Sequence, residues 1–192
     1  RAACEALALL LEQAMTILLG EGASTAEPAA AIRTARLIDG IRLRWGGRAQ
    51  AAGIGFDLLA APDLPAFLAL DPALIERILS NLLGNAFKHA DGGHVTCQIS
   101  ATAEAHLQIR VQDDGPGFPL ALLSQLAPGA GVAGGGKPGS GLGLRIVNDM
   151  LHRIGGSMVL RNLVPHGAEV VVLLPQANAD TADSRHASLP DL

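Results

Sequence analysis

The sequence predicts an α+β fold in which a helical hairpin precedes a mixed α/β unit. Two long stretches with apolar residues at helical spacing come first, residues 2–19 and 28–52, separated by a break rich in glycine, serine and threonine. From residue 53 the pattern changes to short alternating stretches typical of strands, with two further helices between them. The expected organisation is hairpin, α/β unit and polar tail, over residues 1–52, 53–175 and 176–192.

The elements of the α/β unit follow from turn residues and apolar spacing. Asp71-Pro72 marks one helix start, because an aspartate side chain can cap a helix and proline fits its first position. The expected helices span residues 72–89 and 141–154. The expected strands span residues 55–60, 66–70, 94–100, 105–112, 157–162 and 168–174.

Composition excludes several classes of protein. Hydrophobic residues make up 49% and charged residues 17%, which excludes a disordered chain. The net charge of −4 and the 3% of aromatic residues argue against binding to nucleic acid or to an anionic membrane. Residues 6–19 are too short and too polar to span a bilayer. We expect a fragment of a cytoplasmic protein whose two cysteines, Cys4 and Cys97, are reduced thiols.

The helix over residues 72–89 carries a polar stripe opposite its apolar face. This stripe carries Asn81, Asn85 and Lys88, each about one turn after the one before. Amide oxygens are hard, neutral ligands suited to Mg²⁺, and a lysine beside them suits phosphates. A merely solvated polar face is an equally good interpretation of this helix alone.

A second candidate feature is the turn that follows the strand over residues 105–112. Asp113 stands at the strand end, and Gly115-Pro116-Gly117-Phe118 follows. A carboxylate beside bare backbone can accept a hydrogen bond from a purine amino group, and Phe118 could form an apolar wall. An ordinary Asp-Gly turn is the alternative.

A third candidate feature opens the helix over residues 141–154. Gly139-Ser140-Gly141-Leu142-Gly143-Leu144 would present backbone N–H groups and a helix dipole to an anion. The spacing matches neither the dinucleotide fingerprint nor the P-loop. Lys137, just upstream, is a candidate phosphate contact or simply an exposed loop lysine.

Together and in this order, the three features resemble the catalytic ATP-binding domain of sensor histidine kinases. Residues 75–89 resemble the family's N box, residues 113–118 its G1 box and residues 139–144 its G2 box. The closing strand, ending in Leu174-Pro175, is also similar, so the resemblance covers residues 53–175. Residues 36–52 resemble the second dimerisation helix that leads into this domain.

The resemblance implies a two-layer α/β sandwich of the Bergerat type, with ATP between the N-box helix and a lid over residues 120–138. Asn85 would be the principal Mg²⁺ ligand, supported by Asn81. Lys88 would contact the phosphates, and His89 would pack near the nucleotide. Asp113 would bind the adenine amino group. The expected nucleotide-binding set is completed by Gly115, Gly117, Phe118, Lys137, Gly139, Gly141, Leu142 and Gly143.

The sequence also departs from its relatives in ways that bear on mechanism. Asn81 stands where the hydrolytic gyrase and chaperone relatives carry a glutamate, and an amide cannot act as a general base, so the phosphotransferase branch is favoured. The lid lacks the family's pair of phenylalanines. No histidine precedes His89, so the phosphoacceptor lies before this chain, on another chain, or is missing altogether. His152 is expected to cap its helix instead.

These features define the expected partners and the competing functions. The resemblance implies a response regulator or a separate phosphoacceptor domain as partner. It also implies a homodimer through the N-terminal helices, whose apolar face includes Ile32 and Ile38. A non-catalytic interaction module that keeps the fold is the main alternative. A self-sufficient ATPase is the third hypothesis.

Overall fold

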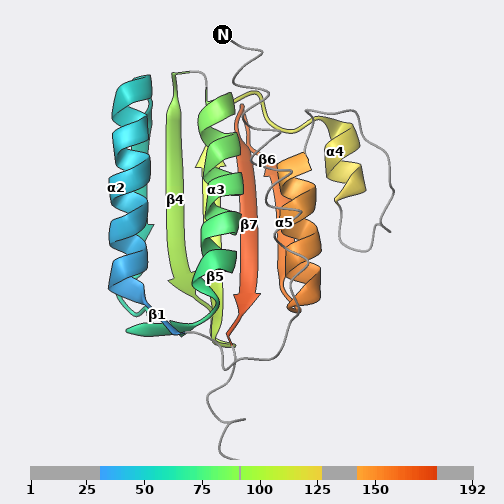
Figure 1. Cartoon of the computed structure of the whole chain (residues 1–192). Coiled ribbons are helices and arrows are strands. Elements are labelled where there is room, and N and C mark those ends of the chain that lie inside the picture. Colours follow the sequence, from blue (N-terminus) through green and yellow to red (C-terminus); the bar gives the residue numbers. More distant parts are fainter. Residues whose placement is uncertain (1–30, 91, 127–141, 177–192) are drawn as a thin grey trace, which may run out of the picture.

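The molecule is built of two layers, a five-stranded sheet and a row of helices on one face of it. The computed structural model describes residues 31–90, 92–126 and 142–176. The strands, in their order across the sheet, are β2 (Gly55–Ala60), β4 (His94–Ala101), β5 (His106–Asp113), β7 (Ala168–Pro175) and β6 (Ser157–Asn162). The helices that cover the sheet are α2 (Thr34–Ala52), α3 (Pro72–His89) and α5 (Leu142–Arg153), which lie side by side in Figure 1. The predicted two-layer α/β sandwich is thus confirmed.

The central helix α3 forms as its sequence predicts. The Asp71 carboxylate accepts a hydrogen bond from the Ala73 N–H at 2.9 Å, and Pro72 occupies the first turn. Its apolar face is buried against the sheet through Ile75, Ile78, Leu79, Leu82, Leu83, Ala86 and Phe87. This burial fixes the direction in which the remaining, polar face of α3 points.

The N-terminal end of α2 differs from the expected helix over residues 28–52. Residues Ala31–Arg33 form a short strand, β1, which pairs antiparallel with β3 (Phe67–Ala69), and α2 begins only at Thr34. The Thr34 N–H donates to the Ala66 carbonyl at 3.0 Å, and its hydroxyl donates to the Pro65 carbonyl. Pairing with a distant strand therefore overrides the local helical pattern here.

Helix α2 belongs to the same hydrophobic core as the sheet. Its buried stripe includes Ile38, Ile41 and Trp45, and the Trp45 ring stacks on Phe87 of α3 with ring centroids 5.4 Å apart. Ile38 is therefore covered within the chain, which corrects its assignment to an intermolecular face. The expected division after residue 52 stays a prediction. The first helix of the expected hairpin and the tail from residue 177 lie outside the described residues.

The far face of the sheet carries a polar row across three strands. The buried Glu169 of β7 accepts a hydrogen bond from Gln112 Nε2 of β5 at 2.9 Å. Arg110 of β5 and Arg161 of β6 approach its carboxylate at 3.5 and 3.6 Å. A buried carboxylate is tolerable here because several donors compensate its lost hydration. The row ties β5, β7 and β6 together behind the face that holds the helices.

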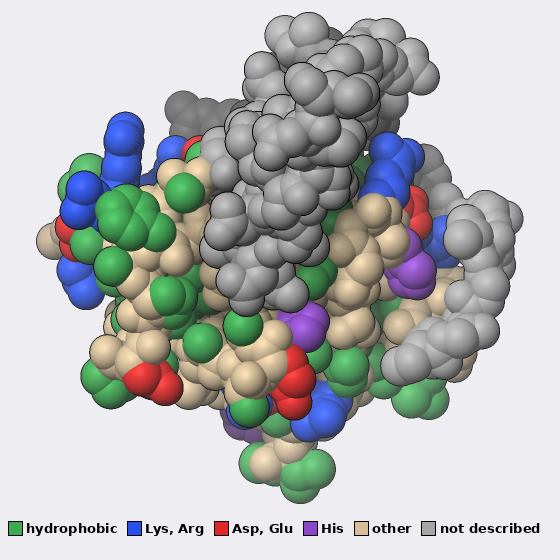
Figure 2. All heavy atoms as spheres, turned by 90° about the horizontal axis from the view of Figure 1, so that it is seen from below, with side chains coloured by type: hydrophobic (Ala, Val, Ile, Leu, Met, Phe, Trp, Pro, Cys, Tyr) green, Lys and Arg blue, Asp and Glu red, His purple; other side chains and the backbone are tan. Residues whose placement is uncertain are grey.

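The surface shows no single dominant charge on the face seen in Figure 2. Basic and acidic side chains lie there in separate small groups among apolar and neutral ones. Within the described residues, no helix is both long enough and apolar enough to cross a membrane.

Candidate nucleotide-binding site

The first part of the site lies where α5 begins, against the polar face of α3. Asn81 and Asn85 are both half-buried, and Asn81 Nδ2 donates to the Arg77 carbonyl at 2.8 Å. A Cβ atom placed on Gly143 would lie 2.7 Å from Asn81 Oδ1 and 3.5 Å from Asn85 Nδ2. Only a glycine lets the first turn of α5 pass this close to the two amides. The N box and the G2 box therefore meet in space, although about 60 residues separate them.

The second part of the site lies at the C-terminal end of α3, one turn beyond Asn85, where β5 ends. Asp113 is 8% exposed, and its Oδ1 accepts a hydrogen bond from the Gly115 N–H at 2.9 Å. A Cβ atom on Gly115 would come within 2.5 Å of the His89 carbonyl oxygen. The turn after β5 thus packs directly on the C-terminal end of α3.

The electrostatics of Asp113 suit a buried acceptor. Burial raises the pKa of its carboxyl above the ordinary value, and the nearby charge of Asp114 raises it further. The Gly115 N–H and a positive charge on His89 oppose this effect. Ionised Asp113 is therefore costly until a donor in the site compensates it, and the amino group of a purine is such a donor.

The turn is held at its far end by a residue that the sequence analysis did not single out. The Phe118 N–H donates to Asn162 Oδ1 at 2.7 Å, and Asn162 Nδ2 donates to the Phe118 carbonyl at 3.0 Å. Gly117, just before, has a φ of +85°, which favours glycine. Asn162 lies 44 residues after Phe118, and only the strand register could have brought them together.

The structure brings together some of the predicted site residues and leaves others untested. Asn81, Asn85 and Gly143 form one cluster, and His89, Asp113 and Gly115 form the other. Lys88, His89 and Leu142 are exposed, and Phe118 is half-buried. Lys137, Gly139 and Gly141 lie outside the described residues, as does the lid beyond residue 126.

The described part of the lid forms a short helix, α4 (Leu120–Gln125). Arg145 of α5 donates a hydrogen bond to the Gln125 side chain, so the two helices are connected. Sequence reasoning had treated this stretch only as lid, without a helix. His152 interacts through Nδ1 with the Asn148 carbonyl at 2.8 Å, near the end of α5.

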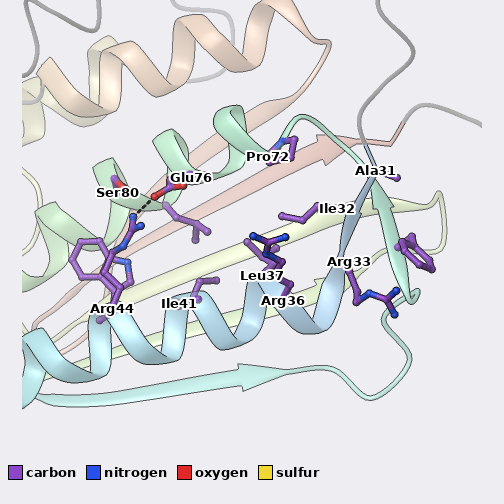
Figure 3. A pocket seen from close by; sticks show the side chains of 14 residues that line it. Ala31, Ile32, Arg33, Arg36, Leu37, Ile41, Arg44, Pro72, Glu76 and Ser80 are labelled. Atoms are coloured by element: carbon purple, nitrogen blue, oxygen red, sulfur yellow. Dashed lines mark hydrogen bonds and ion pairs between the residues drawn. The ribbon is translucent and has the colours of Figure 1, made fainter.

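A separate groove lies on the opposite flank of α3. It has a volume of about 560 Å³ and is lined by residues of β1, α2, β3 and the first half of α3. Figure 3 shows Leu37 and Ile41 on its α2 side and the ion pair between Arg44 and Glu76 across it. None of the predicted nucleotide-binding residues lines this groove.

The part of the chain that the structure describes offers no cage of carboxylates around the predicted metal ligands. Among residues 31–90, 92–126 and 142–176, no three histidine, cysteine, aspartate or glutamate side chains gather as a metal-binding group. The amide oxygens of Asn81 and Asn85 remain as hard donors beside the helix start. This donor set fits Mg²⁺, which takes few protein ligands and completes its shell with water and phosphate.

The fold and these two clusters define an ATP-binding domain of the histidine kinase class. The family model described as "Histidine kinase-, DNA gyrase B-, and HSP90-like ATPase" matches residues 70–178, more than half of the chain. The chain belongs to this family, and it is the ATP-binding catalytic region of a sensor histidine kinase with the Bergerat fold.

Individual relatives agree with this assignment. The chain is 38% identical over 134 residues to the sensor histidine kinase component HK1 of Mycobacterium tuberculosis, covering 67% of this chain and 75% of HK1. It is 38% identical over 117 residues to the signal transduction histidine-protein kinase AfsQ2 of Streptomyces coelicolor, covering 59% of this chain and 22% of AfsQ2. The chain thus spans about a fifth of the length of AfsQ2.

Two solved structures are similar as well. Full-length ShkA in complex with AMPPNP is 28% identical with a TM-score of 0.66, covering 82% of this chain and 33% of ShkA. The mycobacterial sensor histidine kinase MprB is 26% identical with a TM-score of 0.58, covering 77% of this chain and 98% of that one.

Proposed function

We propose that this chain binds Mg-ATP along the polar face of α3 and delivers the γ-phosphate to a histidine that the chain does not itself supply. The observation that carries this proposal is the close approach of Gly143 to Asn81 and Asn85. It places a helix N-terminus, which favours anions, directly beside two amide side chains. Asp113 lies beside the C-terminal end of the same helix, where a base would be bound.

The adenine would be recognised at Asp113. Its carboxylate accepts a hydrogen bond from the exocyclic amino group, and burial makes an unpaired charge at this position costly. Guanine presents a carbonyl oxygen at the corresponding position, so two acceptors would face each other. We therefore expect adenine nucleotides to be preferred. Gly115, whose missing side chain lets this turn pack on the end of α3, would hold the Asp113 carboxylate in place through its N–H.

The phosphates would be held where α5 begins. Asn85 would ligate Mg²⁺ through its amide oxygen, Asn81 would support the metal or the phosphates, and the exposed Lys88 would reach the phosphate oxygens. Bound Mg²⁺ would neutralise the charge that develops as the γ-phosphoryl group leaves ADP. Leu142, Gly143 and the adjoining Gly139 and Gly141 would direct backbone N–H groups at the phosphates, and Lys137 would add a further contact.

The acceptor would be an imidazole rather than water. A neutral imidazole nitrogen attacks the γ-phosphorus, the bond to the ADP oxygen breaks, and phosphohistidine forms. Asn81 supports this direction, because its amide cannot take a proton from an attacking water. The partners would be a phosphoacceptor domain and a response regulator in the cytoplasm. A homodimer through the N-terminal helices stays part of the proposal.

Phosphotransfer to an added acceptor tests this function. The chain is incubated with labelled ATP, Mg²⁺ and a separate histidine-containing acceptor domain, and acid-labile phosphohistidine is measured. We expect transfer that is lost in Asn85→Ala, with little hydrolysis of ATP by the chain alone. Steady hydrolysis that is lost in Asn85→Ala would instead identify a self-sufficient ATPase. ATP binding without transfer to any acceptor would favour a non-catalytic module.

A further inference from the structure

The turn that would carry the adenine is fastened at both ends by side chains from different strands. At its start, Asp113 of β5 accepts from the Gly115 N–H at 2.9 Å. At its end, Asn162 of β6 makes two hydrogen bonds with the backbone of Phe118, at 2.7 and 3.0 Å. Because a backbone N–H donates and a carbonyl accepts, the orientation of the Asn162 amide is uniquely determined.

The two fastening residues lie in one row of the sheet. Asp113 is paired with Ala168 of β7, and Ala168 is paired with Asn162 of β6. Residues in one row point to the same face, so both polar side chains reach the helix-covered side, two strands apart. Ala168, between them, is 4% exposed and carries the smallest side chain of the row. The small residue leaves room for the turn to cross from β5 to β6.

The spacing of this row is held from behind. The next row of the sheet points to the far face. It consists of the direct chain neighbours of Asp113, Ala168 and Asn162, which are Gln112, Glu169 and Arg161. The Gln112 amide donates to Glu169 at 2.9 Å, and Arg161 lies 3.6 Å from the same carboxylate. The distance between Asp113 and Asn162 is thus supported by polar contacts to the buried Glu169 carboxylate, in addition to the backbone hydrogen bonds of the sheet.

We infer that Asn162 is a positioning residue for nucleotide binding, which acts by fixing the backbone of Gly117 and Phe118 opposite Asp113. The inference rests on the proposed function, because it assigns the turn to the base of the nucleotide. Asn162 itself touches the turn. Phe118 lies outside the sheet, so no neighbouring strand binds its N–H and carbonyl groups, and the Asn162 amide binds both of them instead. Because the turn is already fixed, less conformational entropy is lost when a base binds against it.

Calorimetry of the full chain with ADP or GDP in the presence of Mg²⁺ tests this role. In Asn162→Ala we expect ADP affinity to fall roughly tenfold, the scale of one net hydrogen bond, and the preference for ADP over GDP to narrow. Asn162→Asp keeps the size and the acceptor but loses the donor, so it should also weaken ADP binding. Ser157→Ala, at an exposed position at the start of the same strand, is the matched control and should bind as wild type does.

A second measurement separates positioning from folding. Hydrogen exchange at the Phe118 amide should accelerate in Asn162→Ala, while amides of β5 and β7 remain protected. Equal losses of ADP and GDP affinity with a lowered melting temperature would overturn the inference, since the hydrogen bonds between Asn162 and Phe118 would then serve only stability. Unfolding of both Asn162 variants would overturn it for the same reason. Failure of wild type to bind ADP would instead overturn the proposed function.

Discussion

Asp113 is buried at the end of β5, although its ionised form would be the stronger acceptor for the amino group of a base. Burial raises the pKa of its carboxyl, so the folded state favours the protonated form. Such a group stabilises the fold below its ordinary pKa, and this contribution is lost as pH rises through the raised value. The residue therefore reduces stability at neutral pH in a position where it would serve binding.

The substitution Asp113→Asn tests this cost. We expect the melting temperature of the variant, relative to wild type, to increase between about pH 4 and pH 8, because the amide never ionises. ADP binding should be weakened in the same variant. Asp63→Asn, at an exposed position, is the control and should show no such trend. A pH-independent difference, or a variant that is less stable at neutral pH, would contradict the account.

At the same scale, Asp113, Asn81 and Asn85 could be proposed as site residues because their chemistry and spacing stand out in the chain, and their roles stay predictions. Asn162 could not. A single asparagine before Leu163 is an ordinary strand end, and its partner lies 44 residues away. Only the register across β5, β7 and β6 aligns it with Asp113. Pairing register of this kind depends on the whole sheet.

At the scale of elements, α3 and α5 approach each other at Gly143, where the proposed site would hold the phosphates. Helix α3 could be predicted closely because its cap and apolar face agree with each other. The start of α2 could not, since β1 forms only by pairing with β3. The short helix α4 was missed because Leu120–Gln125 has too few residues for a periodic signal.

Gly143→Ala tests the approach of α5 to α3. Alanine in a helix is favoured over glycine by about 0.5–1 kcal/mol, so the fold should not lose stability through propensity. The added Cβ would nevertheless meet Asn81 Oδ1 at 2.7 Å and displace that amide. We therefore expect nucleotide affinity to fall about tenfold or more, measured by calorimetry with ADP and Mg²⁺.

The same substitution elsewhere provides its control. Gly47 lies on α2, and a Cβ atom there would have no atom within 4 Å. Gly47→Ala should raise the free energy of unfolding by a few tenths to about 1 kcal/mol and leave binding unchanged. Wild-type affinity in Gly143→Ala would show that α5 does not form the phosphate end of the site.

At the scale of the whole molecule, α2 is part of the domain that carries the site. Trp45 is 5% exposed and stacks on Phe87 of α3, so α2 supports the helix that bears Asn81 and Asn85. The sequence predicted that α2 belongs to the preceding hairpin. An apolar helix face can be recognised from its spacing, but the spacing does not reveal which surface covers that face. The hairpin itself stays a prediction.

Trp45→Ala measures this contribution of α2. Replacing a large buried aromatic residue costs about 3–5 kcal/mol, which is a large part of the stability of a domain of this size. Leu43→Ala, on the same helix but 82% exposed in the wild type, should change stability by less than about 0.5 kcal/mol. Urea unfolding followed by far-UV circular dichroism measures both. Equal, small effects would mean that α2 is dispensable to the domain.

Binding of ADP in the presence of Mg²⁺ by the wild-type chain tests the central claim most directly. Titration calorimetry should show one site per chain, with affinity strongly reduced in Asn85→Ala, at the proposed metal ligand, and in Asp113→Ala, at the proposed contact to the base. No binding heat for the wild type, or unchanged affinity in Asp113→Ala, would contradict the assignment of this site to ATP.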